Sequence, residues 1–301
     1  MLLQLTLFLG FAALGILLQR RADGDRLRDL AWVASFWTIT PLIVLVTFLR
    51  LRLDDELVRA LVASVVACYL VIALAYLYAF LVAGERDERG ALVLGGAFGN
   101  TVFIGYPLAH LAFGQTGFTL AVLYDRLSLL FPMTSVSTVI ARLHGNRQVD
   151  VARDQRLRAI LLNPPAWALV AAVALRLAGV HPRLDWVNET LAYAISAWGF
   201  LLLGLALPLD RIEHDRQEVA RAAGVLAIKF GASPLVLYLC GRAIGADIPP
   251  TFYLMAAMPA AFHLLVLARV YDVRPALMRL LVVGSTVPGV VAVAVGVAIF
   301  R

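Results

Sequence analysis

The chain has 301 residues, of which 61% are hydrophobic and 15% are charged. Soluble domains carry about 25% charged residues, so this composition excludes a soluble protein and predicts an integral membrane protein. The net charge of +6 does not indicate nucleic-acid binding, because the arginines stand between apolar segments, where membrane topology explains them.

Ten apolar segments predict ten transmembrane helices, because one bilayer crossing takes about 20 residues. We place them at residues 2–19, 29–49, 57–83, 90–113, 117–141, 157–178, 188–208, 219–243, 251–270 and 275–300. The first segment has no basic residue ahead of its apolar run, and Arg20 and Arg21 follow it. We therefore interpret it as a retained helix and not as a secretory signal.

The arginines predict how these helices are oriented. The loops that follow odd-numbered helices hold seventeen arginines when the adjoining helix ends are included, and those that follow even-numbered helices hold six. Basic residues gather in cytoplasmic loops, which places both termini on the non-cytoplasmic side of the plasma (inner) membrane. Two inverted repeats of five helices follow, residues 1–141 and 157–301, joined by a cytoplasmic loop of residues 142–156.

Two of the predicted helices contain residues that break helices. Residues 95–107 include four glycines, the Asn100-Thr101 pair and Pro107, and residues 255–263 include Pro259 and His263. Proline removes a backbone donor and glycine weakens a helix. Unwound backbone at membrane depth persists only where it faces protein or a water-filled cavity. Paired breaks at matching places in two halves indicate a transporter site.

The orientation of the two breaks predicts what such a site would bind. A new half-helix can begin after each proline, and both new N-termini would point toward the middle of the membrane. Each N-terminus offers unpaired N–H groups and about half a positive charge, which favours an anion such as a carboxylate. The alternative is that Pro107 and Pro259 only kink two packed helices.

Five polar residues within the predicted helices are further candidates. Asn100 and Thr101 could contact a substrate or bridge helices. His263 could bind substrate, carry a proton, or simply bond a neighbouring helix. Lys229 lies mid-helix, where an ammonium is costly; it could pair with Asp125, take part in coupling, or extend to an interface. Asp125 and Arg126 are adjacent in sequence, so we expect them to face different directions.

No enzyme motif stands out, so we expect no catalytic residues, no cofactor and no metal site. Cys68 and Cys240 lie inside apolar segments without metal-ligand spacing, and we interpret both as packing residues.

Several motifs together resemble the auxin efflux carrier family, which includes bacterial members and the plant PIN carriers. The segment Asn100-Thr101-Val102-Phe103-Ile104-Gly105-Tyr106-Pro107 is similar to the family's Asn-Thr-x-x-x-Gly-x-Pro motif. Asn163-Pro164, Met258-Pro259, the stretch 267–271 and Ser285-Thr286 resemble its second half. The resemblance covers nearly the whole chain.

The resemblance implies an all-α membrane protein of ten helices in two inverted five-helix repeats, with broken crossover helices 4 and 9. Helices 1, 2, 6 and 7 would form a scaffold against which the crossover domain moves, as in an elevator. It implies a dimer, and a substrate site at Asn100, Thr101, Gly105, Pro107 and Pro259, to which the residues themselves add His263.

Three functions remain open from the sequence. The first is a secondary active transporter for a small organic anion, coupled to H+ or Na+ or uncoupled. The second is a sodium-coupled symporter of the bile-acid type, for which Asp125 is the one deep acid. The third is a membrane sensor that keeps a transporter fold without transporting.

Overall fold

The computed structural model describes residues 2–20, 23–50, 54–149, 163–180, 182, 185–207 and 215–299. Part of the predicted connecting loop (150–156), the predicted start of the sixth helix (157–162), the end of the seventh (208) and residue 300 of the tenth lie outside these ranges.

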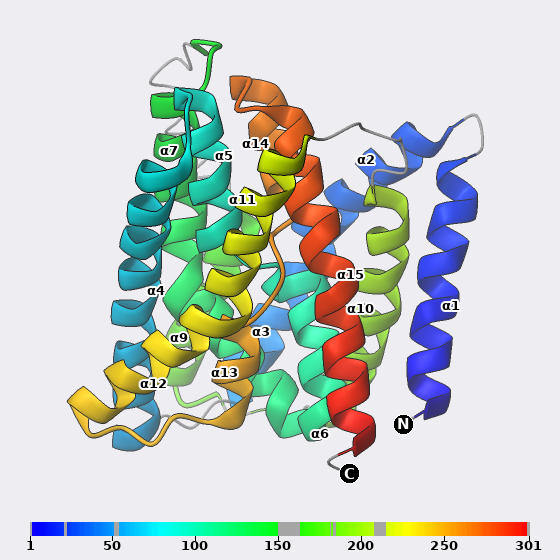
Figure 1. Ribbon diagram of the computed structural model, residues 1–301. Coiled ribbons are helices and arrows are strands. Elements are labelled where there is room, and N and C mark those ends of the chain that lie inside the picture. Colours follow the sequence, from blue (N-terminus) through cyan, green and yellow to red (C-terminus); the bar gives the residue numbers. More distant parts are fainter. Residues whose placement is uncertain are drawn as a thin grey trace. The chain divides into compact units, whose positions relative to one another are not determined.

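Regular structure in the described residues is helical apart from one isolated bridge (Figure 1). The α-helices are α1 (Leu2–Gln19), α2 (Gly24–Ala34), α3 (Thr40–Arg50), α4 (Asp55–Val82), α5 (Arg86–Ala97), α6 (Tyr106–Leu123), α7 (Ser137–His144), α9 (Pro164–Leu177), α10 (Asp185–Ala206), α11 (Arg216–Ala227), α12 (Ser233–Ile244), α13 (Pro250–Ala256), α14 (His263–Tyr271) and α15 (Pro275–Ile299). Five π-helical turns continue some of them: η1 (Ser35–Ile39), η2 (Thr101–Gly105), η3 (Tyr124–Leu129), η4 (Pro132–Val136) and η5 (Ile228–Ala232).

Five helical segments of the described residues are long and apolar enough to cross a membrane. They are Arg26–Arg50, Asp55–Val82, Glu189–Ala206, Arg216–Ile244 and Pro275–Ala292. Thr6–Gln19 and Pro164–Leu177 are shorter apolar helices. The protein is therefore an all-α membrane protein, as the composition predicts. The predicted fourth and ninth spans are not continuous helices, because each is interrupted near its middle.

Local sequence explains several helix boundaries. Asp54 accepts a hydrogen bond from the Leu57 amide at 2.8 Å and caps α4, and Asn163 accepts one from the Ala166 amide at 3.1 Å at the start of α9. Such caps satisfy amides that have no partner within the helix. Gly114, with φ of 64°, turns the chain within α6, since glycine takes positive φ without strain.

The chain divides into two compact units. Unit 1 comprises Met1–Leu53, Val102–Leu123 and Asp150–Leu207, and unit 2 comprises Asp54–Thr101, Tyr124–Val149 and Pro208–Arg301. Unit 1 thus holds α1, α2, α3, α9 and α10, which belong to predicted helices 1, 2, 6 and 7. It also holds α6. The remaining helices belong to unit 2.

Unit 1 is held together by close helix packing. α1 runs along α10, and a Cβ added to Gly15 would lie 2.3 Å from Leu201 O, so this pair of helices needs glycine to approach so closely. Phe8 and Phe200 stack with ring centroids 5.5 Å apart. Trp198 donates from Nε1 to Ser35 Oγ at 2.7 Å and ties α10 to η1.

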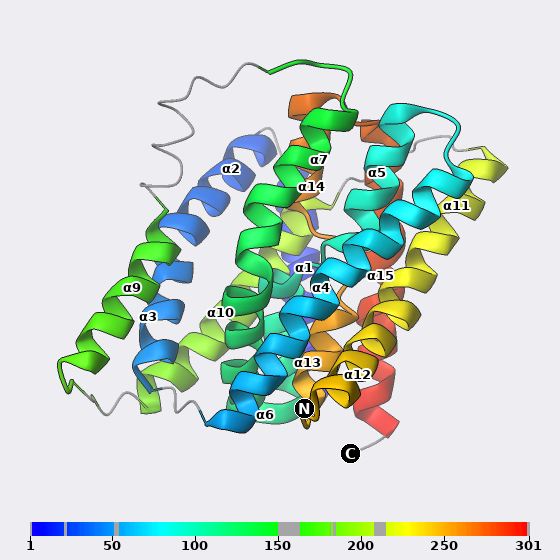
Figure 2. The same ribbon diagram turned by 90° about the vertical axis from the view of Figure 1, so that its left-hand side faces the viewer.

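In unit 2, α4 packs against both α5 and α12, and Figure 2 shows α4 beside α12 in the foreground. Small residues allow the approach, because a Cβ added to Gly96 would lie 3.2 Å from Ala75 Cβ. Tyr78 on α4 donates its hydroxyl proton to Arg221 O at 2.8 Å, which joins α4 to α11.

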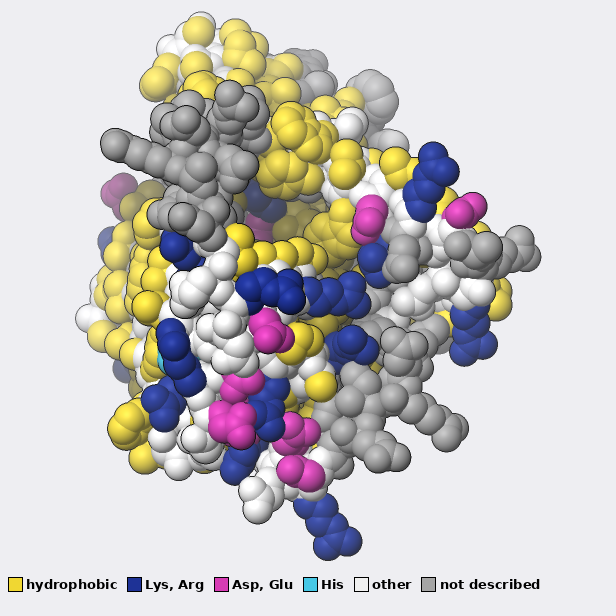
Figure 3. Space-filling model, turned by 90° about the horizontal axis from the view of Figure 1, so that it is seen from above, with side chains coloured by type: hydrophobic (Ala, Val, Ile, Leu, Met, Phe, Trp, Pro, Cys, Tyr) yellow, Lys and Arg dark blue, Asp and Glu magenta, His cyan; other side chains and the backbone are white. Residues whose placement is uncertain are grey.

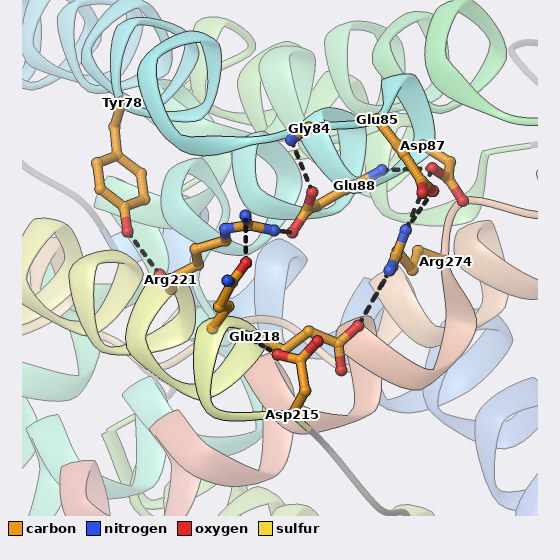
Figure 4. Close-up of polar contacts among 10 residues, drawn as sticks. Tyr78, Gly84, Glu85, Asp87, Glu88, Asp215, Glu218, Arg221 and Arg274 are labelled. Atoms are coloured by element: carbon orange, nitrogen blue, oxygen red, sulfur yellow. Dashed lines mark hydrogen bonds and ion pairs between the residues drawn. The ribbon is translucent and has the colours of Figure 1, made fainter.

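One end of unit 2 carries a cluster of ion pairs, which we call the charged network (Figure 4). Its members are Glu85, Asp87, Glu88, Glu218, Arg221 and Arg274. Arg274 reaches Glu85 at 2.5 Å, Glu218 at 3.3 Å and Asp87 at 3.8 Å. Figure 3 views the molecule from this end and shows basic and acidic side chains gathered there.

The network joins segments that are distant in sequence. Glu88, whose side chain is 2% exposed, pairs with Arg221 of α11, and its other carboxylate oxygen accepts from the Gly84 amide at 2.9 Å. Arg274 adopts a φ of 40°, which costs free energy for a residue with a Cβ. Its three acidic partners offset that cost, so the network fixes the ends of α5, α11 and α15 together.

Candidate functional site

Two extended segments of unit 2 cross between broken helices. α5 ends at Ala97 and α13 ends at Ala256, while α14 begins at His263. In Figure 1 the orange link between α13 and α14 shows one of the two breaks. We call residues 98–101 and 257–262 the crossing. The sequence prediction that both spans are interrupted is therefore confirmed.

Backbone hydrogen bonds join the two segments at the crossing. Gly99 and Ala260 form an antiparallel bridge. The Asn100 amide donates to Pro259 O at 2.7 Å, and the Ala261 amide donates to Phe98 O at 3.1 Å. Each segment thus satisfies backbone groups that a broken helix leaves without a partner, and satisfying them is essential in an apolar environment.

The centre of the crossing is packed closely around Gly99. A Cβ added to Gly99 would lie 3.1 Å from Met258 O and 3.3 Å from Lys229 Nζ. Both contacts are tighter than a side-chain carbon normally makes, so a larger residue requires Met258 and Lys229 to shift. The close approach of the two segments therefore favours glycine at this position.

The structure changes the predicted correspondence between the halves. The sequence matched Pro107 with Pro259, 152 positions apart (259 − 107), whereas the crossing pairs Gly99 with Ala260, 161 apart (260 − 99). Pro259 lies in the crossing, but Pro107 is the second residue of α6. The π-helical turn η2 separates the first break from Pro107, and no sequence pattern indicates such a turn.

The candidate residues belong to different units. Asn100, Thr101, Pro259 and His263 lie in unit 2, at or directly beside the crossing, whereas Gly105 and Pro107 lie in unit 1. Asn100 is 4% exposed and Thr101 is 1% exposed, so both are buried. His263 is the first residue of α14. Its buried Nε2 has no hydrogen-bond partner among the described residues.

Asp125 is engaged by two neighbours. Thr101 Oγ1 donates to Asp125 Oδ1 at 2.5 Å, and Arg126 Nε lies 2.7 Å from Asp125 Oδ2. The expectation that Asp125 and Arg126 face different directions is wrong. They lie in the π-helical turn η3, and the arginine side chain is long enough to fold back on its neighbour.

Lys229 is also buried beside the crossing, with 2% exposure. Its Nζ donates to Ala97 O, at the end of α5, at 3.3 Å. This carbonyl is its hydrogen-bond partner among the described residues, so the predicted alternative of a Lys229–Asp125 pair is wrong. The other alternative, extension to an interface, does not fit its burial either.

Sequence reasoning missed several residues at this place. Ser285 Oγ accepts from the Ala260 amide at 2.9 Å and so supports the crossing from α15. Cys68 and Tyr124 line a pocket together with Lys229 and Gly99. Nothing in their apolar surroundings in the sequence indicates this role, and Cys68 was interpreted as packing.

The fold and the crossing define an all-helical membrane protein built around two broken, crossing spans. Residues 36–295 match the family described as membrane transport protein. The chain belongs to this family, the one that contains the auxin efflux carriers, and it is a membrane transporter and not an enzyme. The family resemblance predicted from the sequence is confirmed.

Two curated relatives are similar along most of their length. One, from Rhizobium meliloti (strain 1021), is named "Putative malonate transporter"; it is 26% identical over 276 residues, which cover 88% of this chain and 85% of the relative. The other, from Methanothermobacter thermautotrophicus, is named "Uncharacterized transporter" and is 26% identical over 225 residues, 73% of this chain and 70% of the relative.

Proposed function

We propose that this transporter is a secondary active carrier of a small organic anion, such as a dicarboxylate, and that it works by alternating access. The observation that carries the proposal is the crossing, where two interrupted spans meet through Gly99 and Ala260. Helix breaks of this kind mark substrate and ion sites in carriers. The name of the Rhizobium meliloti relative supports malonate as the first substrate to test.

The arrangement of donors narrows how the anion would be held. The amides of Asn100, Thr101, Ala260 and Ala261 donate to Pro259 O, Gly99 O, Ser285 Oγ and Phe98 O. They therefore stabilise the crossing itself. We propose that the anion is bound by the N-terminus of α14, where His263 lies, and by the side-chain amide of Asn100, with the positive end of the helix dipole favouring negative charge. Thr101 donates its hydroxyl proton to Asp125, so we propose that it shapes the site without donating to the anion.

The division into two units supports an elevator mechanism. The unit with the crossing contains the charged network and the broken-helix segments α5, α13 and α14, whereas the other contains the predicted scaffold helices and α6. We propose that unit 2 moves as a body against unit 1 and carries the anion with it. Gly105 and Pro107 of unit 1 remain site residues by family resemblance. Ten transmembrane helices in two inverted repeats, non-cytoplasmic termini and a dimer in the plasma membrane belong to the same proposal.

The positions of Asp125 and Lys229 make a bile-acid-type sodium symporter the weaker candidate. A sodium site needs free oxygen ligands, and the Asp125 carboxylate is engaged by Arg126 and Thr101. The ammonium of Lys229 lies against the carbonyl end of α5, where it would repel a second cation.

Uptake into liposomes tests the proposal. Purified protein reconstituted with internal malonate should exchange it for external radiolabelled malonate, and the same vesicles with Gly99→Val protein should not. Acetate, succinate and a neutral diamide of malonate would define the anion class. Two results would overturn the proposal: equal malonate exchange in protein-free vesicles, or equal transport of malonate and its neutral diamide.

A further inference from the structure

Lys229 is a buried cation that has no role in the proposed anion site. It lies in η5, between α11 and α12, and 2% of its surface is exposed. An ammonium inside a membrane protein is costly and needs compensation. A single neutral carbonyl, Ala97 O at 3.3 Å, is a weak partner for a full charge.

The pocket around Lys229 contains no acidic side chain among its lining residues. Cys68, Gly99, Tyr124 and Ser233 line it, together with Ala97, Met255 and Ala256 at the ends of two helices. The compensation must therefore come mainly from backbone dipoles and from polar, uncharged side chains.

The helix directions supply that compensation. α5 ends at Ala97 and α13 ends at Ala256, and both last residues line the pocket. The carbonyl end of a helix carries about half a negative charge. In carriers with broken helices, such carbonyl ends commonly coordinate the coupling cation. The Lys229 ammonium donates to the last residue of α5 and lines one pocket with the last residue of α13, so it occupies a place that favours a monovalent cation.

We propose that Lys229 is a built-in counter-cation: its ammonium takes the position of a bound metal cation and neutralises the carbonyl ends of α5 and α13. The crossing is then charge-balanced without sodium, and the cation remains with unit 2 throughout. One consequence is that transport needs no sodium, and this consequence rests on the proposed carrier function. The role of Lys229 as a counter-cation does not depend on that function.

The proposal predicts that removing the side chain creates a site for a free cation. Lys229→Ala should leave a cavity beside two carbonyl ends, open to Na+ or to ethylammonium. We expect this variant to unfold at a lower temperature than wild type when choline is the only monovalent cation. Adding Na+ or ethylammonium at constant ionic strength should raise its unfolding temperature by about 2 °C or more, because ligands that bind the native state stabilise it.

Two variants serve as controls. Lys229→Met fills the cavity without a charge, so its unfolding temperature should be low and independent of the cation. Cys240→Ala makes a small cavity at a buried position of α12, away from Lys229, and should show no response. Wild type should unfold at the same temperature in sodium and in choline.

Each outcome decides the proposal. A Lys229→Ala protein that folds and ignores both cations would overturn it, as would a wild type stabilised by sodium over choline. Should Lys229→Ala fold too poorly to purify, its yield of monodisperse protein from membranes is measured with and without ethylammonium in growth and extraction. A higher yield with ethylammonium supports the proposal. An unchanged yield, in an experiment where Lys229→Met folds well, contradicts it. These unfolding measurements contain no substrate, so their outcome does not depend on whether the malonate exchange assay succeeds.

Discussion

Unit 2 contains two polar regions that are built in opposite ways. The charged network brings six ionised side chains together and pairs them with one another. The crossing is made of backbone, with Gly99 and Ala260 at its centre and the lone ammonium of Lys229 beside it. Paired charges stabilise a fixed arrangement, whereas the partial positive charge at the N-terminus of α14 can attract an anion. The first region therefore holds helices together, and the second is suited to binding.

The largest effect should come from filling the centre of the crossing. Gly99→Val would place side-chain atoms against Met258 O and Lys229 Nζ, where even a Cβ would come within 3.1 and 3.3 Å. Displacement of a binding site by about 1 Å can cost 100-fold in rate, so we expect malonate exchange to fall at least about that much. Gly231→Val is the matched control, because a Cβ at Gly231 meets nothing within 4 Å. Equal loss in both variants would show that the crossing is not special.

The next effect tests the charged network as a structural element. Arg221→Ala leaves the buried Glu88 carboxylate without its arginine, and breaking a buried pair from one side costs about 3 kcal/mol or more. We expect that loss in the free energy of unfolding, measured by denaturant in detergent, with substrate affinity unchanged.

Asp29→Ala provides the comparison for Arg221→Ala. It removes the ion pair with Arg28 from a side chain that is 73% exposed, and should cost less than about 1 kcal/mol. A change in malonate affinity for Arg221→Ala greater than its change in stability would contradict the division of roles.

A smaller effect is expected from the polar side chains at the crossing. Asn100→Ala should weaken malonate binding by about tenfold, because it removes roughly one hydrogen bond to a charged ligand. Thr101→Val removes the hydroxyl that donates to Asp125 Oδ1 and should weaken binding less, and Thr101→Ser, which keeps the hydroxyl, should restore affinity. Calorimetry on purified protein measures all three variants, and unchanged affinity for Asn100→Ala would exclude it from the site.

The smallest effect concerns pH at the charged end of unit 2. Burial lowers the pKa of His144 below its ordinary value of 6.5, and the charges of Arg86 and Arg89 act in the same direction, against the hydrogen bond to Arg86 O. The unfolded chain then binds the proton more readily than the folded one. Stability is therefore full above about pH 6.5 and declines as pH falls below it.

For His144 we expect a small loss of stability between pH 7 and 5. His144→Gln should remove that part of the pH dependence in thermal unfolding, while malonate binding at neutral pH stays the same. An unaltered pH profile in this variant would assign the dependence to another group.

Sequence patterns predicted the breaks but not how they meet. Glycines at 95, 96 and 99 and Pro259 weaken helices wherever they occur, so the interruption follows from local chemistry. The register of the crossing does not, because it depends on η2 and on which carbonyls lie opposite Asn100 and Ala261. The sequence consequently pairs Pro107 with Pro259, although the chain is extended eight positions earlier, at Gly99.

The charged candidates show the same limit. Lys229 and Asp125 are conspicuous in apolar segments, and the sequence correctly marks both as needing partners. Their partners are a backbone carbonyl for Lys229 and, for Asp125, its own sequence neighbour Arg126 in a π-helical turn. Neither partner leaves a pattern in the sequence, since every residue has a carbonyl and helical periodicity places adjacent residues apart.

Binding of malonate to purified wild-type and Gly99→Val protein, compared by calorimetry in choline chloride without sodium, tests the central claim most directly. The account predicts saturable binding to wild type and none to Gly99→Val, with Gly231→Val behaving as wild type. Equal binding to wild type and Gly99→Val, or wild-type binding that appears only when sodium is added, would contradict it.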